Sequence, residues 1–351
     1  MSDPVPALSL PVQPPIAPML AEVAHELPTG DGWLYEPKWG GFRALVFWDA
    51  RQLLMQSRDL RPLNRYFPEL EAGLRQVLPA PCVLDGELVI AGPKGLDFEA
   101  LQQRIHPAAS RIQLLARETP AEFVAFDLLA TSAEDFTARP QAERRQRLER
   151  LLARPAAPLH LTPSTTERAT AADWFARFEG AGLDGVIAKR AEAPYRPGER
   201  SMLKVKHERT VDCVVSGFRW HKDGHGSAIG SLLLGLYDEH GVLHYVGGAS
   251  SFKTPERRRL VAFLESYRGP SGFGQGRTPG EPNRWTGDRD ISWEPLRPEL
   301  VCEVAFDHLQ GERFRHGATF RRWRYDKPPR ECAFAQVEEV VPSELKDIFG
   351  V

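Results

Sequence analysis

The chain has 351 residues, of which 42% are hydrophobic and 26% are charged. These values are typical of globular proteins and argue against a chain that is disordered throughout, and the length allows two domains of ordinary size. The formal net charge of −2 excludes a polycation, so any contact with nucleic acid must come from local basic patches.

The first 30 residues are rich in proline and predict an extended N-terminal arm, residues 1–30. They lack the basic and apolar regions of a secretory signal, and no stretch approaches the roughly 20 apolar residues that a membrane span needs. The cysteines (Cys82, Cys213, Cys302 and Cys332) are far apart and form no CxxC pair, which argues against a zinc ribbon. We therefore expect a reduced, cytoplasmic protein with no membrane contact.

From residue 31 to residue 207 the sequence alternates short apolar runs with turns and a few helical patterns, which predicts a first domain of sheets with flanking helices. The expected strands are Ala44–Trp48, Cys82–Ile90, Phe123–Leu129, Gly185–Arg190 and Ser201–Lys206, and the expected helices are Gln141–Leu152 and Ala171–Glu179.

The sequence pattern changes after His207, where we place the domain boundary. The expected strands are Val211–Phe218, Ser231–Tyr237, Val242–Gly247 and Leu300–Phe306, and the expected helix is Pro255–Tyr267. Several strands and one helix fit a small antiparallel barrel, so residues 208–351 are predicted to form a second domain of this kind. The linker Glu208–Val211 is the candidate hinge.

Charged residues interrupt the apolar strands of the first domain. They are Asp85 and Glu87 in one strand, Lys204 and Lys206 in another, and Asp127 and Lys189 in two more. Residues two apart in a strand share a face, and ionised groups are costly to bury unless they are paired or bind a ligand. A single such residue is usually on a solvated face, but the repeated pattern suits a site for a triphosphate and a divalent metal.

Lys38 lies in the segment Tyr35–Arg43, before Gly40 and Gly41, which allow a tight turn and the close approach of a ligand. A lysine is a nucleophile only when its amine is uncharged, a state that burial or nearby positive charge favours. The alternative for this motif alone is a surface lysine beside a glycine turn.

Taken in chain order, these segments resemble the nucleotidyltransferase motifs of ATP-dependent DNA ligases, from about Pro15 to the C-terminus. The likeness is greatest to small stand-alone bacterial ligases related to the ligase modules of end-joining proteins. Lys38-Trp39-Gly40-Gly41-Phe42-Arg43 stands where the family has Lys-x-Asp-Gly-x-Arg, which implies Lys38 as the adenylated, catalytic residue. The implied fold is α+β: an ATP-grasp-like nucleotidyltransferase domain of antiparallel sheets with flanking helices, followed by an OB-fold β-barrel.

The resemblance also implies roles for residues in the later motifs. Phe126 would stack on adenine, the lysines at 204 and 206 would contact the α-phosphate, and the ending Arg324-x-Asp326-Lys327 would orient the leaving β,γ-phosphates from the OB domain. The implied cofactor-binding residues are Glu36, Arg43, Arg58, Glu87, Phe126, Lys189, Lys204, Lys206, Arg324 and Lys327, and the implied metal ligands are Glu87, Asp184 and Asp326.

Two positions depart from the family pattern. Gly40 replaces the Asp of the first motif and removes a carboxylate beside the nucleophile. Asp184 replaces a Glu and shortens the reach of a metal ligand by one methylene group. We expect the Gly40 replacement to slow adenylation, sealing or both.

The implied function is sealing of nicked double-stranded DNA in repair, with ATP and Mg²⁺ or Mn²⁺, through a lysyl-AMP and an adenylated 5′-phosphate. We expect a monomer that is nucleoid-associated when it acts on DNA, and other repair proteins are candidate partners. The alternatives are an RNA ligase or a GTP-dependent capping enzyme of the same superfamily, and a nick-binding protein that Gly40 has weakened or inactivated.

Overall fold

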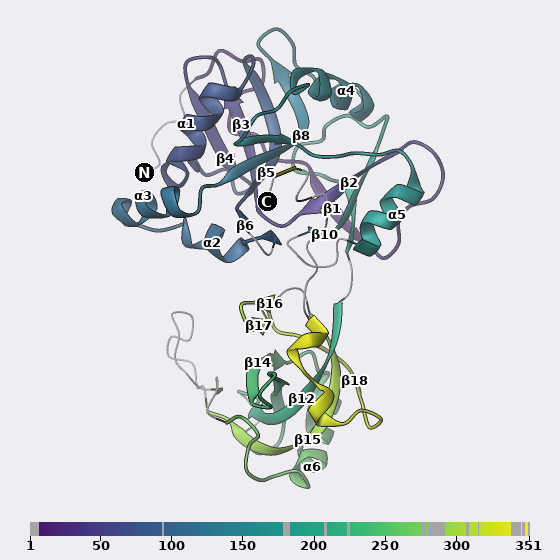
Figure 1. Ribbon diagram of the computed structural model, residues 1–351. Coiled ribbons are helices and arrows are strands. Elements are labelled where there is room, and N and C mark those ends of the chain that lie inside the picture. Colours follow the sequence, from purple (N-terminus) through teal and green to yellow (C-terminus); the bar gives the residue numbers. More distant parts are fainter. Residues whose placement is uncertain are drawn as a thin grey trace. The chain divides into compact units, whose positions relative to one another are not determined.

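The computed structural model divides into two compact units, each of which is described by itself (Figure 1). Unit 1 comprises Met1–His207 with Glu339–Val351, and unit 2 comprises Glu208–Glu338. The structure describes residues 7–92, 95–177, 183–206, 209–222, 225–274, 278–279, 292–306, 309–314, 316–337, 345 and 348–349, without the side chains of Asp184 and Gln310. The C-terminal segment, which the sequence places in the second domain, groups with unit 1, and the sequence-based domain bounds stay a prediction.

Two sheets form the frame of unit 1. In order across the sheet, one consists of β4 (Leu53–Ser57), β3 (Phe42–Trp48), β5 (Cys82–Val89), β8 (Glu122–Thr131) and β9 (Leu159–Leu161). The other consists of β1 (Leu20–Ala24), β11 (Arg200–Lys206), β10 (Leu183–Arg190) and β2 (Trp33–Trp39). Neighbouring strands are antiparallel, as the sequence predicts, except that β1 pairs with β11 and β8 pairs with β9 in parallel.

The expected strands form because apolar runs fill the interior of unit 1. Residues Phe123–Ala130 of β8 are all buried, as are Ala44–Phe47 of β3, so these central strands are covered on both faces. Helices pack their apolar residues against this frame, for example Leu70 and Leu74, which lie one turn apart. The helices are α1 (Pro68–Val77), α2 (Phe98–Gln103), α3 (Ala109–Glu118), α4 (Gln141–Leu151) and α5 (Arg168–Arg177), with a 3₁₀ turn η1 (Asn64–Tyr66) and the short strands β6 (Ala91–Gly92) and β7 (Gly95–Leu96).

The proline-rich N-terminal segment packs onto unit 1. Leu8, Leu10 and Val12 are buried in one cluster with Tyr195, and Leu20–Ala24 forms the edge strand β1. Parallel pairing brings Leu20 of β1 opposite Arg200 of β11. The segment expected as an extended arm therefore forms part of the wall of unit 1.

The main element of unit 2 is a five-stranded antiparallel sheet that curls into a barrel, beside the two-stranded sheet of β16 (Leu309–Gln310) and β17 (Arg313–Phe314). The strand order of the larger sheet is β14 (Leu243–Ala249), β13 (Ile229–Tyr237), β12 (Arg209–Trp220), β15 (Glu294–Phe306) and β18 (Thr319–Trp323). A parallel bridge between Ala249 of β14 and Ala318, the residue before β18, brings the two edges of this sheet together, and the Ala318 N–H donates to Gly248 O at 2.9 Å. The remaining elements are α6 (Thr254–Glu265), η2 (Pro329–Glu331) and η3 (Phe334–Val337).

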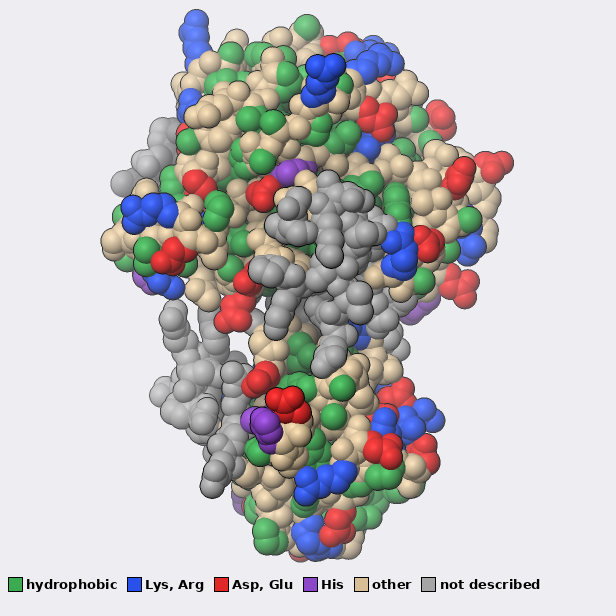
Figure 2. Space-filling view, viewed as in Figure 1, with side chains coloured by type: hydrophobic (Ala, Val, Ile, Leu, Met, Phe, Trp, Pro, Cys, Tyr) green, Lys and Arg blue, Asp and Glu red, His purple; other side chains and the backbone are tan. Residues whose placement is uncertain are grey.

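Several sequence-based predictions can be compared with these bounds. The strands expected at 44–48, 82–90, 123–129, 185–190 and 201–206 all form, with ends shifted by one or two residues. The expected hinge Glu208–Val211 lies in β12 from Arg209 onward, and Glu208 is outside the described residues. None of the described helices combines the length and hydropathy that crossing a bilayer requires. On the face in Figure 2, positive and negative side chains are interspersed over each unit, which agrees with the net charge of −2.

Asp127, which the charge pattern suggests as a phosphate-site or metal-site residue, instead belongs to a buried ion pair. Its two carboxylate oxygens accept hydrogen bonds from Nε and Nη2 of Arg144 on α4, both at 2.9 Å. Both side chains are almost completely buried, and Arg144 also donates to Arg139 O at 2.6 Å. The pair fixes α4 on β8, so the charge of Asp127 has a structural explanation.

We expect Arg144→Met to lower the free energy of unfolding by about 3–5 kcal/mol, because it leaves the Asp127 carboxylate buried without a partner. Chemical denaturation measures the change. The matched control is Arg147→Met on the same helix, which removes a half-exposed pair with Glu143 and should change stability by less than about 1 kcal/mol. Equal effects of the two substitutions would contradict the prediction.

Candidate active site

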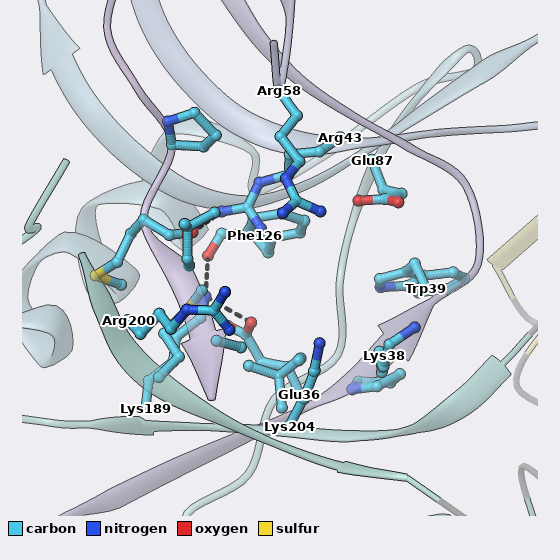
Figure 3. Close-up of a pocket in the computed structure, with 17 residues that line it drawn as sticks. Glu36, Lys38, Trp39, Arg43, Arg58, Glu87, Phe126, Lys189, Arg200 and Lys204 are labelled. Atoms are coloured by element: carbon cyan, nitrogen blue, oxygen red, sulfur yellow. Dashed lines mark hydrogen bonds and ion pairs between the residues drawn. The ribbon is translucent and has the colours of Figure 1, made fainter. Parts of the chain in front are cut away.

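A pocket of about 290 Å³ lies in unit 1, between strands of its two sheets (Figure 3). Eight of the residues predicted from the sequence line it: Glu36, Lys38, Arg43, Arg58, Glu87, Phe126, Lys189 and Lys204. They come from β2, β3, β5, β8, β10 and β11 and from the turn after β4, so residues far apart in the chain meet in one cavity.

Lys38 lies near the end of β2, just before the turn at Gly40 and Gly41, and lines the pocket. The turn requires glycine at 41, because a Cβ atom there would lie 2.1 Å from Leu88 O. Figure 3 shows the amines of Lys38 and Lys204 pointing toward the same open part of the cavity. Burial lowers the pKa of Lys204, and the charges of Lys206, Lys38, Arg200 and Arg58 lower it further. The pocket is therefore electropositive on this side.

Glu87 is the carboxylate of the pocket that is held by the turn at Gly40 and Gly41. Its Oε1 accepts a hydrogen bond from the Gly41 N–H at 3.2 Å. Burial raises the pKa of Glu87 to about 7, although the charges of Arg43 and Lys38 oppose the rise. A carboxyl with this pKa exchanges a proton near neutral pH, and a cation that binds beside it would favour its ionised form.

Phe126 and Arg43 are stacked in the pocket. The guanidinium carbon of Arg43 lies 4.4 Å from the centroid of the Phe126 ring, and the Lys189 amine lies 4.9 Å from it. Asp85, which is completely buried, fixes Arg43 through bonds of 2.5 Å to Nε and 2.6 Å to Nη2. The aromatic ring that the resemblance implies as the adenine contact is thus held among cations.

The carboxylate of Glu36 forms ion pairs with two neighbouring cations. Its Oε2 lies 2.7 Å from the Lys189 amine and its Oε1 lies 3.6 Å from Nη1 of Arg145. Lys189 also donates to Phe126 O at 3.3 Å. Although Glu36 lines the pocket, this geometry makes it a side chain that orients Lys189.

Five predicted site residues are not among the described residues that line this pocket. Lys206 lies next to it on β11, and its charge contributes to lowering the pKa of Lys204. The backbone of Asp184 belongs to β10, but its side chain is outside the described part of the chain. The other three, Arg324, Asp326 and Lys327, belong to unit 2.

In unit 2, the buried carboxylate of Asp212 on β12 binds two of these cations. Nη1 of Arg324 donates to both oxygens of Asp212 at 3.0 Å, and the Lys327 amine lies 3.2 Å away. Asp326 accepts from Nε and Nη2 of Arg324 at 2.9 and 2.8 Å, and this pair lowers the pKa of Asp326 to about 2. Both oxygens of Asp326 are therefore bound to an arginine in this structure, and its role as a metal ligand stays a prediction.

The sequence-based reasoning missed part of the pocket wall. Pro18–Ala21, Trp39, Ile187, Arg200 and Met202 also line the cavity. The signal for Arg200 and Met202 was present, because they belong to the same strand as Lys204. No local signal marked Pro18–Ala21, which reaches the pocket through the pairing of β1 with β11, far along the chain.

The donor set in the pocket fits a nucleotide together with a hard divalent cation. Mg²⁺ commonly uses one or two carboxylates together with phosphate oxygens, and Glu87 can supply such a carboxylate. Among the residues that the structure describes, no group of three or more His, Cys, Asp or Glu side chains could hold a metal by itself.

Comparisons with known proteins agree with this site. Residues 18–206 match the family described as "ATP dependent DNA ligase domain", and residues 225–327 match the "ATP dependent DNA ligase C terminal region". Among curated proteins, DNA ligase C of Mycobacterium tuberculosis is 50% identical over 97% of this chain and 99% of its own length. DNA ligase C1 of Mycolicibacterium smegmatis is 49% identical, over 97% of this chain and 99% of the relative.

A solved structure of a Lig E DNA ligase shares the fold, with a TM-score of 0.54 and 17% identity over 88% of this chain and 99% of that one. The α+β nucleotidyltransferase architecture with an OB-fold domain, predicted from the sequence, is therefore confirmed. With the family matches covering most of its length and relatives near half-identical along nearly all of it, the chain belongs to the ATP-dependent DNA ligases.

Proposed function

We propose that Lys38 is the residue through which this ligase transfers AMP from ATP to the 5′-phosphate at a nick in double-stranded DNA. The observation that carries the proposal is the meeting of Lys38, three further cations (Arg58, Arg200 and Lys204) and the aromatic ring of Phe126 in one pocket. Cations suit phosphate oxygens, and an aromatic ring suits a purine base.

The reaction would have three steps. The amine of Lys38 attacks the α-phosphorus of ATP, so that an N–P bond forms and pyrophosphate leaves. An oxygen of the 5′-phosphate at the nick then attacks the same phosphorus, and the N–P bond breaks. Finally, the neighbouring 3′-hydroxyl attacks the activated 5′-phosphate, which joins the strands and releases AMP.

Charge stabilisation accounts for most of what the pocket residues would do. Lys204, Arg58 and Arg200 would bind phosphate oxygens, on which negative charge develops during transfer. A divalent cation, Mg²⁺ or Mn²⁺, would add positive charge next to these oxygens, with Glu87 as its protein ligand. The predicted metal-binding role of Asp184 stays a prediction.

In unit 2, we propose that Arg324 and Lys327 orient the leaving β,γ-phosphates. Asp212 holds both cations, and Gln336 fixes the backbone of Asp212 by donating from Nε2 to its carbonyl oxygen at 3.2 Å. This support suits a guanidinium that must be placed accurately on a phosphate.

The family identity favours sealing over the alternatives. The relatives reported above are named DNA ligases, which supports DNA rather than RNA as the substrate, and ATP rather than GTP as the nucleotide donor. Relatives of this kind also support an active enzyme over a nick-binding protein inactivated by Gly40, whose effect on rate stays a prediction. Action as a monomer in the cytoplasm, association with the nucleoid and contacts with other repair proteins are likewise predictions.

We expect Lys38→Ala to abolish covalent labelling of the protein by ATP that carries a radioactive α-phosphate, because no other amine would receive AMP. The measurement is a denaturing gel of the labelled protein. Lys253→Ala, at an exposed lysine of unit 2, is the control and should label as wild type does. Labelling of the Lys38 variant at the wild-type level would remove this residue from its role.

The raised pKa of Glu87 predicts a pH-dependent stability of the nucleotide-free protein. Because the folded state keeps a proton that the unfolded state loses from about pH 4.5, the free energy of unfolding should fall as pH rises toward about 7. Glu87→Gln removes this contribution, so the variant should gain about 1–3 kcal/mol relative to wild type between pH 5 and pH 8. Denaturation at both pH values tests this, and parallel curves for the two proteins would contradict it.

We expect Asp212→Asn to slow the adenylation of Lys38 about 10- to 100-fold while the sealing of a pre-adenylated nick changes less than about threefold. The reason is that Arg324 and Lys327 lose their charged anchor, and only the first step releases pyrophosphate. Single-turnover assays of the two steps make the comparison. Glu299→Gln, which breaks an exposed pair with Arg297, is the control, and an equal loss in both steps would argue against this role.

A further inference from the structure

We propose that Tyr195 is a positioning residue for ATP binding, whose hydroxyl group holds the pocket wall Pro18–Ala21 in place. The inference rests on the proposed function and extends it to a residue that does not itself line the pocket. Tyr195 is buried, with 4% of its surface exposed, between the N-terminal segment and the central sheet of unit 1.

The hydroxyl group of Tyr195 makes two hydrogen bonds that link the wall to the pocket floor. It donates to Oδ2 of Asp85 at 2.7 Å and accepts from the Met19 N–H at 3.0 Å. Arg43, which the same Asp85 fixes, donates from Nη2 to the Met19 carbonyl at 3.4 Å. Both polar groups of the Met19 backbone are thus bound by side chains that share one carboxylate.

Met19 depends on these side chains because strand pairing begins only after it. Leu20 is the first residue of β1, and its N–H donates to Glu199 O at 2.8 Å. On the other side, Ile16 is held by Gln56, whose side chain accepts from the Ile16 N–H at 3.1 Å and donates to its carbonyl at 2.7 Å. The stretch from Ile16 to Met19 is therefore anchored at its two ends by Gln56 and Tyr195.

The environment keeps the Tyr195 hydroxyl group protonated, as this arrangement requires. Burial raises the pKa of Tyr195 well above its usual value, and the neighbouring Asp85 charge raises it further. The group therefore stays a donor to Asp85 throughout the neutral pH range. Its ring is covered by Arg144, whose guanidinium carbon lies 5.6 Å from the ring centroid.

Tyr195→Phe tests the inference because it keeps the ring and its packing and removes only the hydroxyl group. The Met19 N–H would lose its acceptor and Asp85 would lose one donor, both in a buried site. We expect the KM for ATP in the adenylation reaction to rise about 5- to 30-fold, with kcat within about twofold of wild type, since Lys38 and the phosphate-binding cations are unchanged.

Tyr35→Phe is the matched control. Tyr35 is equally buried, with 1% of its surface exposed, and its hydroxyl group donates to Pro28 O at 3.1 Å without lining the pocket. Its removal should leave the KM for ATP unchanged. If the two variants raise KM alike, or if Tyr195→Phe lowers kcat at unchanged KM, the proposed role is overturned.

A second variant covers the case in which Tyr195→Phe does not fold. Gln56→Met releases the Ile16 end of the same stretch and should also raise KM more than it lowers kcat. An unchanged KM for ATP in this variant would contradict the proposal that anchoring of this stretch supports ATP binding. The labelling of Lys38 separates the two hypotheses. If the variants label Lys38 as wild type does and their KM for ATP is unchanged, only the positioning role of Pro18–Ala21 is refuted. If AMP is attached to a residue other than Lys38, the proposed function is refuted.

Discussion

The pocket depends on the ion pair between Asp85 and Arg43, because a completely buried carboxylate persists only with a charged partner. Burial opposes the charge of Arg43, but Asp85 more than offsets this effect and raises the pKa of Arg43 above its usual range. Buried pairs of this kind contribute little net stability compared with apolar residues of the same size. What the pair provides is position: it fixes Arg43 against Phe126, and Asp85 also binds Tyr195. Arg43 and Tyr195 in turn bind the backbone of Met19.

The pattern of charged residues in apolar strands marked some side chains that line the pocket and others that are paired in the interior, for one physical reason. Glu87, Lys189 and Lys204 line the pocket, as the pattern suggests. Asp85 and Asp127 show the same pattern but are paired internally, with Arg43 and Arg144. Whether a carboxylate can bind a ligand depends on cationic partners that come from other strands and helices. Such long-range pairs cannot be predicted from the sequence of the strand alone.

The strands show the same contrast: those defined by their own sequence were predicted, and the one that depends on a distant partner was missed. Strands such as β3, β5 and β8 were predicted because burial on both faces demands a continuous apolar run. The edge strand β1 was missed because it is short, follows a proline-rich stretch and has only β11 as its neighbour in the sheet. Composition suggested an arm for this region, yet it supplies a wall of the pocket, since one parallel pairing with a distant strand decides where it lies.

Asp212 and Asp326, the two carboxylates that accept hydrogen bonds from Arg324, differ in their burial, and this difference bears on how neighbouring cations can be held before an anion binds. Cations without counter-charges would repel one another, so carboxylates that neutralise them stabilise the unliganded state. The Asp326 side chain is 70% exposed, and exposed ion pairs are weak. A phosphate could therefore replace Asp326 as the acceptor of the Arg324 hydrogen bonds at little cost in free energy. Asp212 is only 8% exposed, and a buried carboxylate without a charged partner is strongly destabilising. Asp212 must therefore stay bound to the Arg324 guanidinium when Asp326 releases it. If Arg324 binds the leaving phosphates as proposed, Asp212 would retain the orientation of its guanidinium, and Asp326 would give its place to the incoming phosphate.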